Sequence, residues 1–405
     1  MGRRDRQVVG LDIGSTKTCA LIGEHDDDGR VKFLAFGAAE SKGWRKGQIV
    51  NLDLAVSSIR RAVEEAETIV GVPVESALIG VAGSHVRGVN SRGGITMGQK
   101  PRDIEREDVR RAVDTARNVS LPDGREVLHV LPLEFFLDGQ DNIRDPIGMV
   151  GQRLEANVHI VTASATAAQN VVAAVNRAGV RVTDTVLEAL ACADACLTQD
   201  ERELGVCLLD IGGGTTEIIV YSGGVVRHTG ALPVGGEHFT NDLAVGLRTP
   251  IPEAEAIKRR NSCACRDIMG QDAPIEIASV GDRPPRTVFS RMLNDIVEPR
   301  AQELLTLVRD DLRRAGLDTQ IPAGIVFTGG ASQLRGLPEL AERTLALPVR
   351  VAAPRGLVEM SEEVSRPEYS TAVGLVLYGA RAKRLAAQRA TGWTGKLKAL
   401  FAGQS

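Results

Sequence analysis

The feature that most constrains this chain is a sequence element that occurs twice. Residues 8–24 read VVGLDIGSTKTCALIGE, and residues 207–224 read CLLDIGGGTTEIIVYSGG. Each copy runs from an apolar strand through Asp-Ile-Gly and a turn of small residues into a second apolar strand. Asp12 and Asp210 occupy matching places, almost half the chain apart. Such a repeat predicts two related halves, each of which opens with a β-hairpin.

The turns of the two hairpins suit phosphate binding. Their Gly, Ser and Thr residues carry no bulky side chains, so backbone N–H groups can point at an anion. Asp12 and Asp210 each end a first strand, where a carboxylate can orient waters on a Mg²⁺ ion that bridges phosphate oxygens. Lys17 adds a positive charge beside the first turn. One such turn is commonly only a tight hairpin, so it is the pair that favours a clamp on a triphosphate.

A third glycine-rich element lies near the end of the second half. Residues 325–336 read IVFTGGASQLRG, which predicts a buried strand, a Gly-Gly turn and a short helix with Ser332 at its N-cap. Gly329 and Gly330 would let the backbone approach a flat ligand such as adenosine. The glycine spacing of a P-loop also occurs at residues 93–98, but Gln99 stands where that motif needs a lysine.

Composition excludes several other classes of protein. The chain has 405 residues, enough for two or three domains, with 49 basic and 52 acidic side chains and only 3% aromatic residues. Neither a nucleic-acid footprint nor base-stacking platforms are expected. Six cysteines without a Cys-x-x-Cys pair argue against a zinc site or a disulfide framework. The sequence predicts no transmembrane helix and no signal peptide, and a reduced cytoplasm fits best.

The end of the chain differs from the rest in charge. Residues 369–405 contain no Asp or Glu but six Lys or Arg residues. Within them, residues 381–391 are predicted to be a polar linker and residues 392–402 a short amphipathic helix. The side chains expected at an anionic lipid surface are the apolar Trp393, Leu397, Leu400 and Phe401 on one helical face, with Lys396 and Lys398 beside it. Docking of this helix on the body of the protein, or on a partner, is the alternative.

The three glycine-rich elements together resemble the motifs of a known superfamily. LDIGSTKT, LLDIGGGTTE and FTGGASQLRG resemble, in that order, the first phosphate, second phosphate and adenosine motifs of actin-like ATPases. Within that superfamily the chain resembles the FtsA family of bacterial cell division proteins over nearly its whole length, including IVEPR at 296–300 and YSTAVGL at 369–375. The resemblance implies a duplicated actin-like (ribonuclease H-like) α/β fold, in which two lobes surround a nucleotide cleft, with an inserted α+β subdomain and a C-terminal amphipathic helix.

The resemblance also implies how the chain is divided. The expected segments are 1–83 (first part of lobe 1), 84–161 (inserted SHS2-like subdomain), 162–192 (lobe 1 with a connecting helix), 193–235 (first part of lobe 2), 236–300 (small subdomain), 301–364 (rest of lobe 2), 365–380 (return to lobe 1), 381–391 (linker) and 392–402 (membrane helix). In the family, the inserted subdomain is used for contacts between subunits and with later division proteins.

A set of residues is assigned to ATP and Mg²⁺ by the resemblance. Those expected to bind the nucleotide are Asp12, Gly14, Ser15, Thr16, Lys17, Asp210, Gly212, Gly213, Gly214, Thr215, Gly235, Gly236, Glu255, Lys258, Gly329, Gly330 and Ala331. Asp12 and Asp210 would hold Mg²⁺ through water, and Glu188 would position the water for hydrolysis. The alternative for Glu188 is a surface carboxylate, and for Glu255 and Lys258 it is an i,i+3 ion pair on a helix. The implied activity is ATP binding with at most slow hydrolysis.

The implied function is to tether division filaments to the membrane. Such a protein holds FtsZ filaments by their C-terminal tail at the cytoplasmic face of the inner membrane, at the division site. It also assembles with itself into actin-like filaments and recruits later division proteins. The tail would dock on the small subdomain, with Arg286, Asn294 and Arg300 as contacts. The alternative for these side chains is that they only solvate a helix face.

Three other classes of protein share the phosphate hairpins. A sugar or polyphosphate kinase would need a carboxylate base for its acceptor and would have no lipid helix. A chaperone-type ATPase would carry a peptide-binding domain after the nucleotide domain, but few residues follow Gly379. A pilus-assembly relative would share the hairpins, so the C-terminal helix is the feature that distinguishes it.

Overall fold

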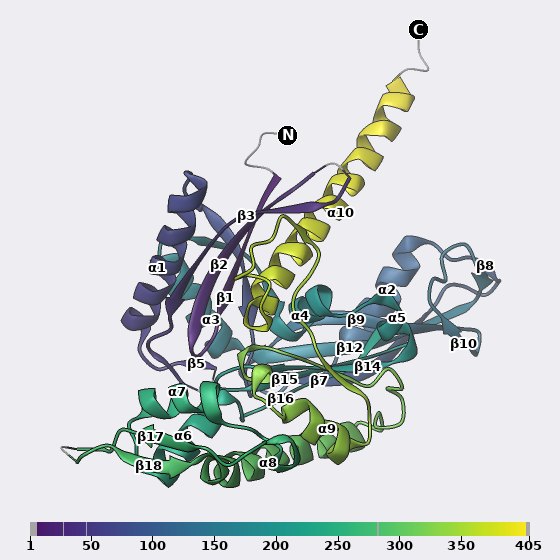
Figure 1. The fold of residues 1–405 in the computed structure, drawn as a ribbon. Helices are drawn as coiled ribbons and strands as arrows, with labels where there is room; N and C mark the ends of the chain where they lie inside the picture. The colour runs from purple at the N-terminus through teal and green to yellow at the C-terminus, as the bar shows by residue number, and fades with distance from the viewer. Residues whose placement is uncertain (1–5, 27, 46, 282, 402–405) are drawn as a thin grey trace.

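Two sheets, one in each half of the chain, form the frame of the protein (Figure 1). The computed structural model describes residues 6–26, 28–45, 47–281 and 283–401, with side chains as far as residue 386. The strand order is β13-β6-β1-β2-β3-β21 in the first sheet and β16-β15-β14-β19-β20 in the second. The strands are β1 (Gln7–Ile13), β2 (Lys17–His25), β3 (Val31–Glu40), β6 (Ser76–Val81), β13 (Arg181–Leu187) and β21 (Leu357–Val358) in the first sheet, and β14 (Val206–Ile211), β15 (Thr216–Ser222), β16 (Val225–Leu232), β19 (Ile325–Thr328) and β20 (Val349–Val351) in the second.

Both sheets are built on the same unit. β1, β2 and β3 are consecutive antiparallel strands, and β6 lies parallel to β1. In the second sheet β14, β15 and β16 repeat this meander, and β19 lies parallel to β14. Nearly every residue of β1 and β14 is buried, as expected for central strands that are covered on both faces. The duplication predicted from the sequence is therefore confirmed.

Helices cover both faces of the first sheet. α1 (Leu52–Val70) and α3 (Ala165–Arg177) pack on one face, and α4 (Glu188–Cys196) and α10 (Ser370–Phe401) pack on the other. The core around α4 and α10 also contains Leu208 and Ile219 of the second sheet. These two helices therefore join the two halves.

Backbone approaches backbone where α4 and α10 meet. A Cβ atom built on Gly374 of α10 would lie only 1.8 Å from the carbonyl oxygen of Ala191 in α4. Only glycine permits so close an approach at this position. The contact fixes α4 and α10 as a pair.

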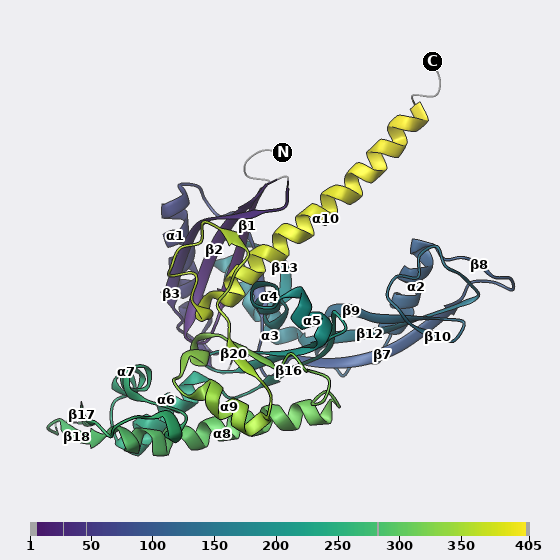
Figure 2. The same cartoon turned by 45° about the vertical axis from the view of Figure 1, so that its right-hand side comes forward.

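α10 leaves the body of the protein as one long helix (Figure 2). Val373 and Leu375 near its start are fully buried, whereas Leu385 is 46% exposed. Residues 381–391 are helical, so the prediction of a linker there is wrong. The reason is that Ala, Leu, Gln, Lys and Arg, which favour helix, make up most of this segment, and neither Gly nor Pro interrupts it.

The predicted membrane-facing residues lie beyond the last described side chain. They are Trp393, Lys396, Leu397, Lys398, Leu400 and Phe401. The backbone of this segment belongs to α10, but its amphipathic face lies outside what the structure describes and stays a prediction.

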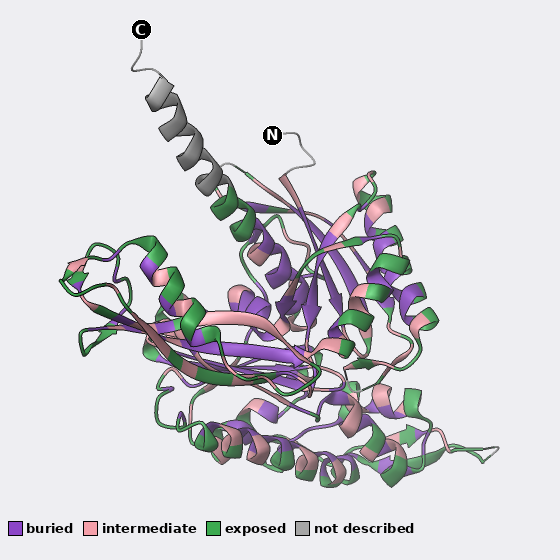
Figure 3. Ribbon diagram, turned by 180° about the vertical axis from the view of Figure 1, so that it is seen from behind, coloured by how far each residue is buried: buried purple, intermediate pink, exposed green. Residues whose placement is uncertain are grey.

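A third sheet projects from the body (Figures 2 and 3). Its strand order is β10-β9-β12-β7, and α2 packs on it. The elements of this unit are β7 (Arg87–Thr96), β8 (Arg102–Asp103), α2 (Arg106–Arg117), β9 (Arg125–Leu137), β10 (Gln140–Ile143), β11 (Val150–Gly151) and β12 (Arg153–Ser164). It docks on β16, the edge strand of the second sheet, where His159 Nε2 and Thr229 Oγ1 lie 2.9 Å apart.

A small helical lobe extends the second half at its far end (Figure 1). It is formed by α6 (Gly236–Leu247), α7 (Ile251–Asn261), the hairpin of β17 (Pro274–Ile277) and β18 (Arg286–Phe289), and the start of α8 (Ser290–Arg314). The remaining elements are β4 (Trp44–Arg45), β5 (Gln48–Ile49), α5 (Gln199–Leu204), η2 (Arg266–Ile268), η3 (Gly330–Gln333), α9 (Leu337–Leu345) and η4 (Pro367–Tyr369).

All six cysteines are buried free thiols. Of the helices in the described part of the chain, none combines the length and the apolar character that crossing a bilayer requires.

We expect Gly374→Ala to lower the free energy of unfolding by at least about 2 kcal/mol, because the added methyl group overlaps backbone atoms of α4. Urea unfolding measures the change. Gly246→Ala in α6 is the control, since its added Cβ meets only the Ile296 side chain, at 2.8 Å, which can move. Unchanged stability of Gly374→Ala would contradict the close packing of α4 and α10.

Candidate functional site

The two hairpin turns have the same geometry. The Gly14 N–H donates to the Lys17 carbonyl at 2.9 Å, and the Gly212 N–H donates to the Thr215 carbonyl at 3.0 Å. These four residues hold matching places in the sequence repeat. The turns enclose Ser15, Thr16, Gly213 and Gly214. The sequence repeat is therefore a repeat of backbone conformation as well.

The turns face each other where the two halves meet. A Cβ atom built on Gly213 would lie 2.5 Å from Thr16 Cγ2. The N–H groups of Gly236 and Glu237, at the start of α6, donate to the carbonyls of Gly212 and Gly213, both at 2.8 Å. The positive end of the α6 dipole therefore lies beside the second turn, where it favours an anion.

Four carboxylates gather at these turns. Asp12, Asp210 and Glu217 are buried, and Glu188 is half-buried. Burial raises the pKa of Asp12 to about 6, although the positive charge of nearby Lys17 acts in the opposite direction. Burial also raises the pKa of Glu217 to about 7, and it raises the pKa values of Asp210 and Glu188. A cation at the turns would offset both the burial and the mutual repulsion of these groups.

Glu217 connects the two halves. Its Oε1 accepts a hydrogen bond from the Gly83 N–H at 2.9 Å, and within the hairpin it pairs with Asp210. Its Oε2 is buried without a hydrogen-bond partner among the described residues. Sequence reasoning missed Glu217, although it ends the LLDIGGGTTE motif.

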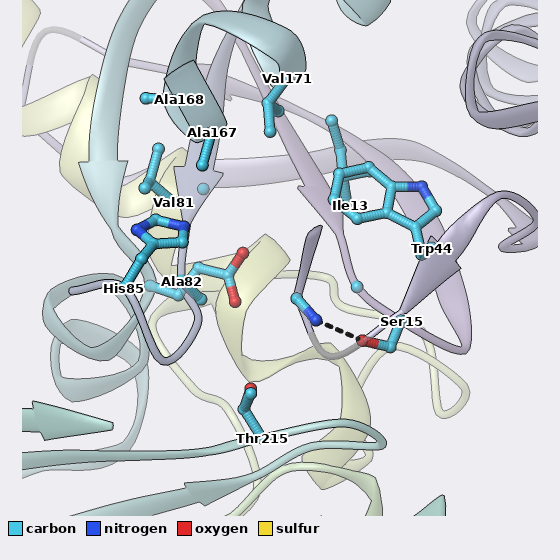
Figure 4. A pocket seen from close by; sticks show the side chains of 14 residues that line it. Ile13, Ser15, Trp44, Val81, Ala82, His85, Ala167, Ala168, Val171 and Thr215 are labelled. Carbon is cyan, nitrogen blue, oxygen red and sulfur yellow. Dashed lines mark hydrogen bonds between the residues drawn. The ribbon is translucent and has the colours of Figure 1, made fainter. Parts of the chain in front are cut away.

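Glu188 begins α4 and lines a pocket of about 40 Å³ beside both turns (Figure 4). A Cβ atom on Gly80 would lie 2.7 Å from Glu188 Oε1, so glycine leaves room for the carboxylate. This volume holds about three waters. The pocket wall also includes Ser15, Trp44, His85, Ala167 and Thr215. The alternative of a surface carboxylate does not hold, because Glu188 faces this pocket.

Lys17 is engaged with the segment that leads into α10. Its Nζ donates to the Glu368 carbonyl at 2.5 Å and lies 3.7 Å from Asp12 Oδ2. It also lies 4.0 Å from the centre of the Tyr369 ring, a cation–π contact. The first hairpin therefore touches η4, directly before α10.

Asp210 is bonded to both α4 and α10. Its Oδ2 accepts from Cys192 Sγ at 3.0 Å and from Thr371 Oγ1 at 3.3 Å. On its other side is Gly329, at φ +83°, where a Cβ atom would lie 2.2 Å from Asp210 Oδ1. Sequence reasoning missed Cys192 and Thr371, because neither belongs to a phosphate motif, although Thr371 lies in the YSTAVGL stretch.

The residues expected near adenosine lie at the starts of α6 and η3. Gly235 is the N-cap of α6, and a Cβ atom on Gly236 would lie 3.2 Å from Ala331 Cβ. The prediction of Ser332 as an N-cap is wrong. Ser332 lies inside η3 and donates its hydroxyl to the Gly329 carbonyl at 2.7 Å.

Lys258 and Glu255 form the helical ion pair that was considered as the alternative. Lys258 Nζ lies 2.6 Å from Glu255 Oε2. Lys258 also donates to the Gly236 carbonyl at 3.0 Å and to Thr240 Oγ1 at 2.9 Å. The pair therefore also holds the start of α6 in place.

No ready-made metal centre exists in the described part of the chain. No group of three or more His, Cys, Asp and Glu side chains there is arranged to hold an ion. Asp12 and Asp210 would need water or phosphate oxygens to complete a coordination shell, which fits a Mg²⁺ ion held through water.

The small lobe buries one of the three residues predicted to bind a partner. Asn294 is fully buried in α8, where its Oδ1 accepts from the Cys263 N–H at 3.1 Å. Its prediction as a surface contact is therefore wrong, since Asn294 lies on the face of α8 that packs into the core.

The two arginines of that prediction are accessible and already bonded. Arg286 is exposed and donates to the Leu247 carbonyl. Arg300 lies 2.6 Å from Asp242 and also pairs with Glu303.

Two protein-family profiles match the chain. The profile described as "Cell division protein FtsA" matches residues 207–374. The profile described as "SHS2 domain inserted in FTSA" matches residues 83–162, which include the projecting sheet except the last two residues of β12.

Solved structures with this fold come from distant relatives. The PilM–PilN type IV pilus biogenesis complex matches with a TM-score of 0.65 at 17% identity, over 92% of this chain and 98% of that one. MreB5 of Spiroplasma citri bound to ADP matches with a TM-score of 0.57 at 14% identity, over 94% of this chain and 98% of that one. At these identities the likeness shows the actin-like α/β fold alone, so the pilus-assembly alternative gains no functional support from it.

Relatives of known name are similar over almost the whole chain. Cell division protein FtsA of Pseudomonas aeruginosa is 45% identical over 374 residues, 92% of this chain and 89% of that protein. The Escherichia coli K12 protein is 41% identical over 379 residues, 92% of this chain and 90% of that protein. The Bacillus subtilis protein is 38% identical over 377 residues, which are 93% of this chain and 84% of that protein. This chain therefore belongs to the FtsA family of cell division proteins, with the actin-like fold and the SHS2 insertion expected of it.

Proposed function

We propose that the protein binds Mg²⁺ and ATP between its two hairpins and links FtsZ filaments to the membrane. The observation that carries the nucleotide part is the pair of matching turns that face each other, with Asp12 and Asp210 behind them. MreB5 of Spiroplasma citri, which shares the fold, has been solved with ADP and with AMPPNP. This supports a nucleotide at the corresponding place here.

Entry of a nucleotide requires the turns to separate. Thr16 touches Gly213, and the pocket beside them measures about 40 Å³. Ligand sites for molecules of nucleotide size take about 300 Å³ or more. We therefore expect the two halves to move apart when ATP enters.

The carboxylates divide the work at the site. Bound Mg²⁺ would supply positive charge to the phosphates. Asp12 and Asp210 would hold the ion through its waters, and Lys17, which now donates to the Glu368 carbonyl, would donate to a phosphate oxygen. Glu188 faces a pocket with room for water, so it can position a water and accept its proton. Burial and the neighbouring carboxylates raise the pKa of Glu188, which disfavours its charged, proton-accepting form and suits slow hydrolysis at most.

Asp210→Asn tests the nucleotide site. Loss of this carboxylate charge should weaken Mg·ATP binding about tenfold or more, which corresponds to about 1.4 kcal/mol. Binding is measured with a fluorescent ATP analogue. Asp108→Asn is the control, because Asp108 is equally buried but pairs with Arg102 in the projecting unit. Equal affinity of Asp210→Asn and the parent would refute the assignment.

Glu217→Gln tests the electrostatics of the site. The folded-state pKa of Glu217 is raised from 4.5 to about 7, so its contribution to stability is present below pH 4.5 and is lost as pH rises through 7. The uncharged variant should be more stable than the parent by less than about 1 kcal/mol near pH 5 and by on the order of 3 kcal/mol at pH 8. Urea unfolding at both pH values measures this difference.

Glu201→Gln is the control of opposite sign. Arg350 and the Thr198 N–H outweigh burial and lower the pKa of Glu201 to about 2, so its charged form stabilises the fold at both pH values. This variant should be less stable than the parent at pH 5 and at pH 8. A Glu217→Gln variant without any gain at pH 8 would contradict the carboxylate cluster.

We further propose that the end of α10 attaches the protein to the cytoplasmic face of the inner membrane at the division site. Support comes from the acid-free sequence of residues 369–405 and from the course of α10 away from the body (Figure 2). A single short helix of this kind binds anionic lipid weakly. Assembly of the protein with itself would multiply that binding through effective concentration.

For the FtsZ tail we propose the exposed surface of the small lobe. Arg286 lies beside the end of α6, where Val245 is 79% exposed, and Phe289 is 54% exposed three residues further on. Such a surface suits a peptide with acidic and apolar side chains. Arg300 can contribute only by leaving Asp242. Later division proteins would dock on the projecting unit, which reaches away from the body (Figure 3).

Co-sedimentation with anionic liposomes and FtsZ tests the tether. The parent should carry FtsZ into the pellet, and Trp393→Glu should lower lipid binding about tenfold or more, since burial of such a side chain contributes about 2 to 3 kcal/mol. Trp393→Glu should still bind FtsZ tail peptide in solution. Leu385→Glu is the control, because Leu385 is exposed on α10 but precedes the predicted membrane segment. This variant should pellet like the parent. Undiminished pelleting of Trp393→Glu would exclude this anchor.

A further inference from the structure

Both phosphate hairpins touch the same short segment, where η4 leads into α10. Lys17 of the first hairpin donates to the Glu368 carbonyl, and Asp210 of the second accepts from Thr371. The residue directly before these contacts bonds to the adenosine element, because the Gly329 N–H donates to the Pro367 carbonyl at 3.2 Å. Residues 367–371 therefore contact all three motifs that are expected to surround a nucleotide.

Thr371 helps to fix the orientation of the Asp210 carboxylate. Its hydroxyl lies 3.1 Å from Cys192 Sγ, and both groups reach the same carboxylate oxygen. All three side chains are buried, so water cannot replace either donor. Hydrogen bonds of this kind hold a carboxylate in the orientation that a metal or its waters require.

Ser370 extends the connection to a second strand of the second half. Its Oγ lies 2.6 Å from Thr328 Oγ1 at the end of β19 and 3.3 Å from Cys196 Sγ. The rest of the buried part of α10 packs against the first sheet and α4. The first turn of α10 is thus bonded to one half while its next turns pack against the other.

α10 can transmit a displacement along its length. The contact of Gly374 with Ala191 joins α10 to α4, and α4 begins at Glu188. From this contact α10 continues without a break to Phe401. Beside its exposed turns lies a cavity of about 370 Å³, lined by Leu377 and Arg381 of α10 among others. A helix that is packed tightly on every side cannot shift, and this cavity leaves α10 room to do so.

We infer that Thr371 is a positioning residue for Asp210 and that, through it, α10 moves when the site fills. The inference rests on the proposed function and deepens it. When the turns part to admit a triphosphate, Asp210 moves with the second half and takes the bonded first turn of α10 with it. Phosphate also draws Lys17 away from Glu368, which frees the segment in front of the helix. The C-terminal segment on α10 is then displaced by events at the nucleotide.

The first test compares Thr371→Val with Thr371→Ser. Val keeps the shape of the side chain and removes the hydroxyl, so Mg·ATP affinity should fall about tenfold, whereas Ser should restore it to within about twofold. With Mg²⁺ removed by a chelator, parent and Thr371→Val should bind the ATP analogue alike, because the hydroxyl acts through Asp210. A merely structural role would lower affinity with and without Mg²⁺.

Two further variants serve as control and as support. Thr344→Val in α9 also removes a threonine hydroxyl that bonds within the protein, to the Leu340 carbonyl at 2.7 Å, and it should bind Mg·ATP like the parent. Cys192→Ala removes the other donor to Asp210. It should show the same Mg²⁺-dependent loss of ATP affinity, so the inference can be tested even if Thr371→Val folds poorly. Parent affinity in both Thr371→Val and Cys192→Ala overturns the positioning role.

The second test measures the movement of α10. Leu385→Cys on α10 and Val351→Cys on β20 are 46% and 41% exposed, and all native cysteines are buried, so spin labels attach selectively to the two new thiols. Saturating Mg·ATP should shift the distance between the labels in the parent and shift it less in Thr371→Val. An unchanged distance in a parent that binds Mg·ATP overturns the movement alone. A parent that binds no Mg·ATP overturns the proposed function, and this inference with it.

Discussion

The close packing of α10 on α4 is the contact on which the rest of the structure depends. Because Gly374 brings the two helix backbones together, one core holds side chains from both sheets, including Leu21 and Leu208. The same packing sets where the two helices begin, and both begin at the hairpin turns. The contact between α4 and α10 therefore joins the halves and also assembles the site. A change in this contact should alter the site as well.

The carboxylate cluster lowers the stability of the folded protein. Burying ionisable groups is costly where their partners do not fully compensate for lost water, and the raised pKa values of Asp12 and Glu217 express that cost. Apolar residues of the same size would pack there without it. What the acids provide is a place where positive charge is stabilising. Their burial and the Gly83 contact of Glu217 also make the boundary between the halves responsive to ligand charge.

Local signals made the hairpins predictable, whereas contacts between distant segments could not be foreseen. The repeated strands, turns and acidic residues lie within short stretches of sequence, so their geometry followed from pattern alone. Thr371 and Cys192 reach Asp210 only because α10 and α4 cross the body, which no local pattern indicates. Asn294 lies between Leu293 and Asp295, and only the packing of α8 places its side chain on the buried face of that helix. The helical conformation of residues 381–391 follows from their composition, because Ala, Leu, Gln, Lys and Arg favour helix.

The length of α10 has a mechanical consequence. From Arg381 to Phe401 the helix rises about 30 Å, close to the diameter of a small domain. Gly392 and Gly395 lie where the amphipathic segment begins, and each weakens the helix by about 1 kcal/mol relative to alanine. The rod is thus easiest to bend at its far end. An end laid flat on a bilayer would leave residues 381–391 upright, as a spacer of about 16 Å between the body and the bilayer.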